Sequence, residues 1–237
     1  MHSKKKLPII IFARCSSKRF PNKVMSNFGN KMLIEHVLKR VNKIKLKSNV
    51  IIATSKRRSD DRLINFIKSK KLSYYRGSLN NVVLRAYECC KKYKINEFVR
   101  VCCDRIYLSP DEINSSIEKY NKNKKKTEIA SNLMSGKIPA GKTIEIIKKS
   151  TLEKILNFTK NKYDLEHVTR FIYKNKKKFQ ILKLKKPKYK SLSHRFAIDN
   201  YADKKRVEFI ESNKKKEFLS DKKIIQLTTK FYNNHEK

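Results

Sequence analysis

The chain has 237 residues, of which 60 are Lys or Arg and 21 are Asp or Glu, so its formal net charge is +39. This length suits one large α/β domain and is too short for two full enzymatic domains, so we predict a single domain over residues 1–237. The longest apolar run, Leu7 to Ala13, has only seven residues, which excludes a transmembrane helix. We read no signal peptide before it and expect a cytoplasmic protein.

The positive charge is a weak guide to function. A charge of this size usually indicates a polyanionic partner. Here the excess is mostly Lys, spread from Lys4 to Lys237 among many Asn and Ile residues, as AT-rich coding produces. We expect no specific nucleic-acid partner, although a basic nucleic-acid-binding protein stays open as an alternative. Five cysteines, two adjacent pairs among them and none in C-x-x-C spacing, favour free thiols over a zinc site.

The chain begins with a predicted core strand that leads into a cationic loop. The apolar run Leu7 to Ala13 stops at Arg14, and Lys18, Arg19 and Lys23 follow within ten residues, among small hydroxyl side chains. In an open parallel sheet, ligands bind beyond the carboxyl ends of the strands. We therefore interpret the loop as a grip for a triphosphate. Alternatively, the cations merely reflect the basic composition, so the position after a buried strand is the stronger argument.

Hydrophobic periodicity predicts alternating strands and helices, the rhythm of a parallel doubly wound sheet. We expect strands at 7–13, 49–54, 72–76, 98–103, 128–133, 143–147, 179–184 and 195–198. We expect helices at 31–44, 59–70, 81–93, 109–120, 164–174, 202–213 and 220–232, with a polar linker at 121–126. Ser109 reads as an N-cap, and Ser150 with Glu153 as a capping box before one more helix. Only four glycines occur, which excludes the G-x-G-x-x-G and Walker A phosphate loops.

Two aspartates follow predicted strands directly. Asp104 comes after V-R-V-C-C, and Asp199 comes after R-F-A-I. Carboxylates at the ends of neighbouring strands can share a cation, and Mg²⁺ prefers one or two carboxylates together with substrate phosphates. Asp is also common in turns and helix caps, which is the alternative interpretation.

The cationic loop carries a family resemblance. Arg14, Ser17, Arg19, Pro21 and Lys23 match R-x-x-S-x-R-x-P-x-K, the signature that opens the sugar-acid cytidylyltransferases. The chain resembles most the SpsF-like spore coat polysaccharide branch, which is similar to the 3-deoxy-manno-octulosonate and acylneuraminate cytidylyltransferases. The resemblance implies a Rossmann-like three-layer α/β/α fold with a mostly parallel sheet, of the nucleotide-diphospho-sugar transferase (GT-A-like) type.

Further matches recur in order along the chain and imply roles for single residues. V-R-V-C-C-D and I-D-N-Y-A-D align with segments that hold Mg²⁺, which implies Asp104 and Asp199 as metal ligands. The implied catalytic residues are Arg14, Lys23 and Asp104. The implied nucleotide-binding residues are Arg14, Ser17, Arg19, Lys23, Arg76, Ser78 and Arg85, and the implied substrate-binding residues are Glu145, Glu166 and His167. Without the resemblance, a histidine on an amphipathic helix, as His167 is predicted to be, is usually a structural or solvated residue.

The sequence also departs from the family pattern. Ser16 and Cys103 stand where glycine is usual, Phe12 replaces a glutamine, and Thr143 and Leu84 replace aspartates, while Arg105-Ile106 replaces C-P. The nucleotide machinery is largely present, whereas the acceptor pocket looks divergent.

The resemblance implies an enzyme that joins CTP to a sugar acid, releases pyrophosphate and serves surface polysaccharide or glycoconjugate synthesis. Mg²⁺ is the implied cofactor, no membrane partner is expected, and a homodimer is compatible with the sequence. A non-catalytic paralogue that has lost turnover through the changes at Cys103 and Thr143 is the alternative.

Overall fold

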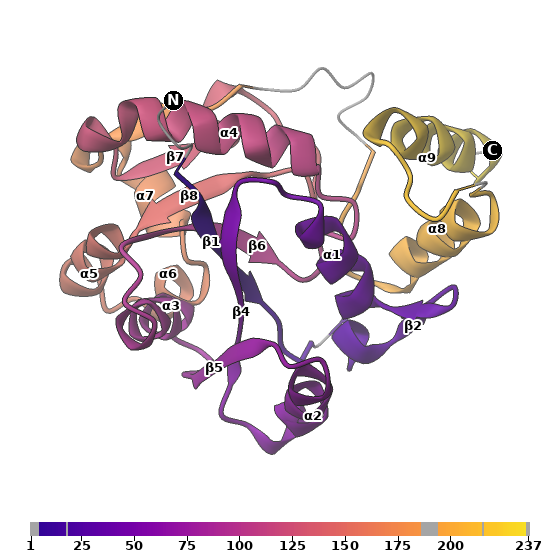
Figure 1. Cartoon of the computed structure of the whole chain (residues 1–237), viewed down its shortest axis with the longest axis horizontal. Helices are drawn as coiled ribbons and strands as arrows, with labels where there is room; N and C mark the ends of the chain where they lie inside the picture. The colour runs from indigo at the N-terminus through magenta and orange to yellow at the C-terminus, as the bar shows by residue number, and fades with distance from the viewer. Residues whose placement is uncertain (1–4, 18, 186–193, 215, 236–237) are drawn as a thin grey trace.

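The computed structural model describes residues 5–17, 19–185, 194–214 and 216–235. A seven-stranded sheet in the order β5-β4-β1-β6-β8-β7-β9 forms its centre (Figure 1). The strands are β1 (Leu7–Phe12), β4 (Lys47–Ser55), β5 (Ser73–Gly77), β6 (Glu97–Cys102), β7 (Ile129–Ser131), β8 (Glu145–Lys148) and β9 (Ile181–Lys183), and β2 (Asn27–Phe28) with β3 (Lys31–Met32) makes a separate hairpin. Only β8 runs antiparallel to its neighbours in the described sheet, so the predicted, mostly parallel sheet is confirmed.

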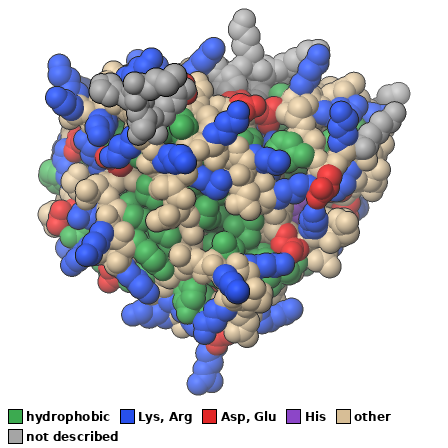
Figure 2. All heavy atoms as spheres, in the orientation of Figure 1, with side chains coloured by type: hydrophobic (Ala, Val, Ile, Leu, Met, Phe, Trp, Pro, Cys, Tyr) green, Lys and Arg blue, Asp and Glu red, His purple; other side chains and the backbone are tan. Residues whose placement is uncertain are grey.

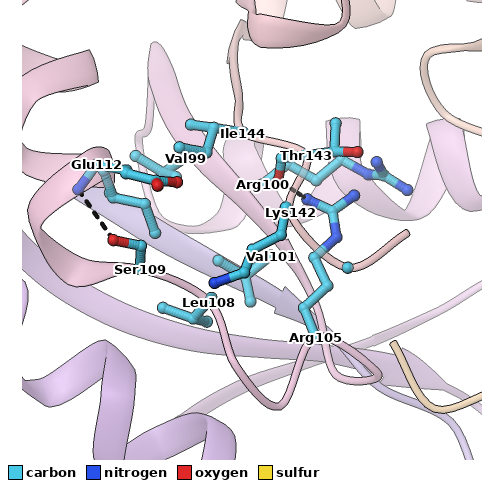
Figure 3. A pocket seen from close by; sticks show the side chains of 12 residues that line it. Val99, Arg100, Val101, Arg105, Leu108, Ser109, Glu112, Lys142, Thr143 and Ile144 are labelled. Atoms are coloured by element: carbon cyan, nitrogen blue, oxygen red, sulfur yellow. Dashed lines mark hydrogen bonds between the residues drawn. The ribbon is translucent and has the colours of Figure 1, made fainter. Parts of the chain in front are cut away.

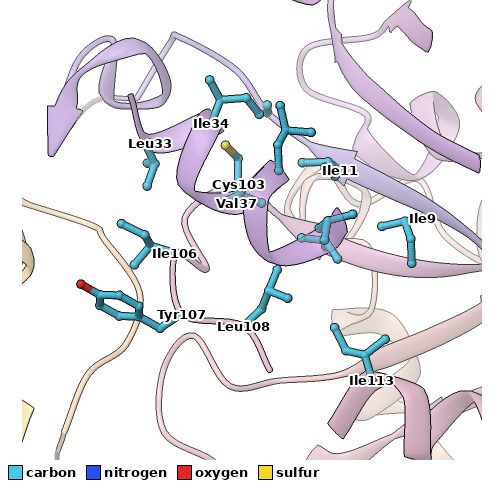
Figure 4. Packing of buried hydrophobic residues seen from close by; sticks show 14 of the residues in the cluster. Ile9, Ile11, Leu33, Ile34, Val37, Cys103, Ile106, Tyr107, Leu108 and Ile113 are labelled. Carbon is cyan, nitrogen blue, oxygen red and sulfur yellow. The ribbon is translucent and has the colours of Figure 1, made fainter. Parts of the chain in front are cut away.

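Helices cover both faces of the sheet. They are α1 (Leu33–Asn42), α2 (Asp61–Ser69), α3 (Val82–Lys92), α4 (Pro110–Asn123), α5 (Lys149–Phe158), α6 (Lys162–Glu166), α7 (Arg170–Lys174), α8 (Tyr201–Ser212) and α9 (Asp221–His235). Because side chains alternate along a strand, Ile9 and Ile11 enter one apolar cluster with α1, α2 and α4 (Figure 4). Ile10 and Phe12 enter the other cluster, with α3, α5 and α7. The three-layer arrangement predicted from the sequence is therefore confirmed.

The first half of the chain follows the predicted order. β1, β4, β5 and β6 are parallel and are joined by α1, α2 and α3 in turn. Their carboxyl ends therefore meet at one edge, which is where the loop after β1 and the turn after β6 lie. The Ser109 cap is also confirmed, since its Oγ accepts a hydrogen bond from the Glu112 amide at 3.2 Å (Figure 3).

Two predicted boundaries in the second half are wrong. The expected linker at 121–126 is instead the end of α4 followed by a 3₁₀ turn at Lys124–Lys126. The N-cap of α5 is Lys148, so Ser150 lies inside the helix and not at its cap. Strand β8 leads directly into α5, and Thr151 Oγ1 donates to the Glu128 carbonyl at 2.8 Å. These tertiary contacts override the local capping-box pattern of Ser150 and Glu153.

The helix expected at 164–174 is broken in two. α6 ends at Glu166, and α7 begins at Arg170. Between them Val168 is fully buried and Thr169 Oγ1 donates to Glu145 at 2.9 Å, contacts that a continuous helix would have to give up. The break leaves His167 exposed at the turn.

The strand expected at 195–198 does not join the sheet. The segment bends at Ala197, and its backbone is held by loops instead: the Phe196 amide donates to the Ala140 carbonyl at 2.7 Å, and the Ile198 amide donates to the Asp104 carbonyl at 3.0 Å. Gly141 adopts a φ of +91°, and a Cβ there would lie 2.4 Å from the Phe196 carbonyl carbon. The close approach of two loops therefore requires glycine at this position.

On the face that Figure 2 shows, the surface is basic mainly toward its rim, and hydrophobic side chains gather in the middle. Lys and Arg side chains stand around its rim and singly across it, with hydrophobic and uncharged side chains between them. Within the described residues, every helix is too short or too polar to cross a membrane. All five cysteines are free, as predicted.

Candidate functional site

A cleft of about 840 Å³ opens at the carboxyl ends of β1 and β6. The loop after β1, the turn after β6, the start of α3, the α6–α7 break and the segment before α8 all contribute to its walls. Its polar lining residues are Arg14, Ser16, Ser17, Arg19, Lys23, Arg57, Asn80, Arg85, Asp104, Glu166, His167 and Asp199. Most of the residues singled out in the sequence thus share one cleft, although they come from distant parts of the chain.

Lys23 lies between the two predicted metal ligands. Its Nζ is 4.0 Å from Asp104 Oδ2 and 3.7 Å from Asp199 Oδ1, and it donates to the Ile198 carbonyl at 2.7 Å. Arg19 Nη2 lies 3.4 Å from Asp199 Oδ1. Asp104 and Asp199 therefore face the same place in the cleft, and the ammonium group of Lys23 occupies it.

Arg14 spans the cleft to the α6–α7 break. Its Nη2 donates to Glu166 Oε1 at 2.8 Å, and its Nη1 donates to the Leu79 carbonyl at 3.4 Å. About a third of each side chain of this ion pair is exposed. The pair joins the loop after β1 to the element that carries His167, so the two walls of the cleft are in contact.

Arg85 is a buried cation at the base of α3. Only 2% of its surface is exposed, Nη1 donates to the Ser78 carbonyl at 3.2 Å, and Nε has no partner among the described residues. Burial, together with the charge of Arg14, lowers the pKa of Arg85 to about 10. A guanidinium in this position favours an anion in the cleft.

Two predicted nucleotide-binding residues lie outside the cleft lining. Arg76 donates to the Ser55 carbonyl at 3.0 Å and pairs with Asp61 at 2.7 Å, which ties the ends of β4, β5 and α2 together. Ser78 Oγ accepts from the Asn81 amide at 3.0 Å just before α3. Both side chains contact neighbouring parts of the protein. Their role in nucleotide binding stays a prediction.

Glu145 is buried beneath a second, shallower pocket of about 460 Å³. Its Oε2 pairs with Arg100 and, at 3.7 Å, with Arg105, while Oε1 accepts from Thr169 at 2.9 Å and Tyr173 at 2.8 Å. Burial alone would raise the pKa of Glu145, but the two arginines and the hydrogen bonds lower it to about 2. The carboxylate thus holds cationic side chains in place below a pocket that shares His167 with the cleft.

The departures from the family pattern are accommodated locally. The Cys103 side chain packs among Ile11, Ile34 and Val37 in the core (Figure 4), so its extra bulk is absorbed there. Arg105 donates to the Thr143 carbonyl, so two of the changed positions contact each other (Figure 3). Beside them, the space drawn in Figure 3 holds only about 10 Å³, room for no more than one water molecule.

Sequence reasoning missed several residues at these sites. Arg57 and Asn80 line the cleft, Arg195 Nη2 pairs with Asp199 at 2.6 Å, and Arg100 lies under the second pocket. Arg57 and Asn80 follow β4 and β5, so their positions after strands were an available signal. The only sequence signal for Arg195 was its spacing of four residues from Asp199, and such a spacing is common in any basic chain.

The model of one protein family, described as cytidylyltransferase, matches residues 8–235. The chain belongs to the cytidylyltransferase family. Among curated relatives, the chain is 32% identical to the uncharacterized protein MJ1063 of Methanocaldococcus jannaschii, over 82% of this chain and 78% of that protein. It is 25% identical to the spore coat polysaccharide biosynthesis protein SpsF of Bacillus subtilis, over 82% of this chain and 81% of that protein.

Solved structures agree with this assignment. A cytidylyltransferase from Leptospira borgpetersenii superposes with a TM-score of 0.84 at 25% identity, over 98% of this chain and 95% of that one. A CMP:2-keto-3-deoxy-manno-octonic acid synthetase complexed with CTP superposes with a TM-score of 0.66 at 12% identity, over 87% of this chain and 99% of that one, which shows the shared fold. The family resemblance seen in the sequence, and the fold it implied, are confirmed.

Proposed function

We propose that this cytidylyltransferase joins CTP to a sugar acid, of the nonulosonate or octulosonate type, and releases pyrophosphate. The observation that carries the proposal is the cleft in which Arg14, Arg19 and Lys23 face two carboxylates from separate segments, Asp104 and Asp199. When both are bound, the triphosphate would pair with the three cationic side chains, and a divalent cation would pair with the two carboxylates. These contacts would replace the ion pairs that the side chains make with each other. The similarity to SpsF, a spore coat polysaccharide biosynthesis protein, supports a place in surface polysaccharide or glycoconjugate synthesis.

In the proposed reaction, a hydroxyl oxygen of the acceptor sugar attacks the α-phosphorus of CTP and loses its proton. The bond from that phosphorus to the oxygen bridging to the β-phosphate breaks, and pyrophosphate leaves. Arg14, Arg19 and Lys23 would hold the β- and γ-phosphates and stabilise the negative charge that grows on the leaving group. Ser17 and Arg85, which also line the cleft, would bind the nucleotide.

The donor set of the cleft fits Mg²⁺. Within the described residues, no group of three or more His, Cys, Asp or Glu side chains gathers as a complete metal site. Two carboxylates are what Mg²⁺ takes from a protein when phosphate and water oxygens supply the rest. Asp104 and Asp199 would hold the ion, which would supply positive charge to neutralise the phosphate groups of the nucleotide.

The second pocket would receive the acceptor. It lies next to the cleft and is lined by Arg100, Arg105, Arg170 and Lys174, with His167 at the border between the two. Such a lining suits the carboxylate of a sugar acid. Glu145 would act there by fixing Arg100 and Arg105, while Glu166 and His167 would face the substrate from the α6–α7 break.

Calorimetric titration with CTP, ATP, GTP and UTP, with and without Mg²⁺, tests the nucleotide half without knowledge of the acceptor. We expect selective, Mg²⁺-dependent binding of CTP that Asp199→Asn weakens at least tenfold. Asp111→Asn, an exposed position on α4, is the matched control and keeps the wild-type affinity. Equal binding of all four triphosphates would rule the proposal out. CTP binding without pyrophosphate release on any sugar acid would favour the non-catalytic paralogue.

A further inference from the structure

A buried carboxylate that the sequence motifs do not include lies directly behind the loop after β1. Asp60 is 0% exposed and ends the short 3₁₀ turn Arg58–Asp60 between β4 and α2. Its Oδ1 accepts a hydrogen bond from the Cys15 amide at 2.7 Å. Its Oδ2 accepts from Thr54 Oγ1 at 2.9 Å, from the Ser55 amide at 3.1 Å and from Ser55 Oγ.

Cys15, whose amide Asp60 accepts from, also holds the loop together through its carbonyl. The Cys15 carbonyl accepts from the Ser17 amide and from the Asn22 amide, each at 2.9 Å. The start of the loop and its far end are therefore both tied to Cys15. Through the Cys15 amide, one carboxylate fixes this unit to the end of β4.

The side chains next to this unit face the cleft. Arg14, Ser16 and Ser17 all line it, and Ser16 Oγ is buried without a hydrogen-bond partner among the described residues. A buried hydroxyl of this kind has hydrogen-bonding capacity that the fold does not use, beside side chains that line the cleft. Because Asp60 itself is fully buried, any effect it has on a ligand must pass through the loop.

We propose that Asp60 is the positioning residue of the phosphate-binding loop, which it holds in the shape that presents Arg14, Ser16 and Ser17 to the triphosphate. This inference rests on the proposed function. The carboxylate is suited to the task because its two oxygens accept four hydrogen bonds here. An amide has one oxygen, so Asn at this position must leave either the Cys15 or the Ser55 amide facing an NH₂ group.

The test compares CTP with CMP, because only CTP carries the β- and γ-phosphates that the loop would bind. We expect Asp60→Asn to weaken Mg²⁺-dependent CTP binding at least tenfold while the affinity for CMP changes less than twofold, in calorimetric titrations. Asp111→Asn is again the matched control and leaves both affinities unchanged. A purely structural role would lower both affinities together, or neither, and either result would overturn the inference.

A milder variant covers the case in which Asp60→Asn does not fold. Thr54→Val removes one of the four hydrogen bonds and leaves the carboxylate in place. We expect a loss of CTP affinity of about threefold to fivefold with CMP affinity unchanged, and an equal loss for both nucleotides would overturn the inference. If wild type binds all triphosphates alike, the proposed function fails, yet a comparison of tri- with monophosphates still tests Asp60.

Discussion

At the residue scale, several charged side chains of the two sites face an opposite charge. Lys23 faces Asp104 and Asp199, Arg14 faces Glu166, and Glu145 faces two arginines. Burying a charge costs far less free energy when an opposite charge pairs with it. If one partner is lost, the other carries the full desolvation penalty. Single substitutions here should therefore have large effects.

Glu145 gives a prediction about stability and pH. Since its folded pKa is lowered from 4.5 to about 2, its contribution is complete above about pH 4.5 and is lost as the pH falls toward 2. We expect Glu145→Gln to lower the free energy of unfolding by about 3 kcal/mol at pH 6, because Arg100 and Arg105 lose their counter-charge. The difference from wild type should narrow between pH 4.5 and pH 3.

Urea unfolding at several pH values measures this effect. Glu153→Gln is the control, because Glu153 is exposed on α5 and should change stability by less than about 0.5 kcal/mol at any pH. A gap between Glu145→Gln and wild type that stays constant down to pH 3 would contradict the assigned ionisation.

At the scale of elements, the segment before α8 reaches the cleft without belonging to the sheet. It is held by backbone bonds to Ala140 and Asp104, and Arg206 donates to its Ala197 carbonyl at 2.6 Å. Contacts with loops and with α8, and no pairing in the sheet, thus place Asp199 opposite Lys23. The position of this carboxylate depends on the close approach at Gly141.

We expect Gly141→Ala to lower stability by about 2 kcal/mol and to weaken Mg²⁺-dependent CTP binding at least tenfold, since a Cβ there would displace the Phe196 backbone. Thermal unfolding and calorimetry measure the two effects. Gly29→Ala is the control: Gly29 has a φ of +62°, but its Cβ would lie 3.4 Å from Glu211 and away from the cleft. Equal CTP affinity in both variants would show that Asp199 does not depend on this contact.

The sequence predicted the repeating strands and helices of the first half well, because each is signalled by its own hydrophobic period. It placed Asp104 correctly after β6 for the same reason. It failed where long-range contacts decide: Val168 and Thr169 break a helix that local propensity favours, and the 195–198 segment pairs with loops. Asp60 could not be recognised as a partner of Cys15, since nothing local relates two residues 45 positions apart.

At the scale of the whole molecule, the charge of +39 and the cleft are separate properties. Lys and Arg are spread over the face in Figure 2, whereas three cations of the cleft, Arg14, Arg19 and Lys23, each face a carboxylate. The first property favours weak, unspecific attraction to any polyanion. The second favours a ligand that brings both phosphates and a cation.

Salt dependence separates the two properties. Between 50 and 200 mM KCl, we expect the affinity for duplex DNA to fall by about a thousandfold, as it does when many phosphates are contacted, and that for Mg²⁺·CTP by about tenfold at most. Fluorescence anisotropy and calorimetry give the two slopes. A CTP slope as steep as that of DNA would mean that the cleft acts only as part of a basic surface.

The order of the site along the chain has a consequence for how such proteins diversify. Apart from Asp199, Glu166 and His167, the polar residues of the cleft lie within the first 104 positions. Apart from Arg100 and Arg105, the second pocket is lined by later residues, among them Thr143, Thr169, Arg170 and Tyr173. The exposed turn Lys124–Lys126 lies between the two groups. Recombination or drift beyond that turn can therefore reshape one half of the site while most of the other is inherited intact.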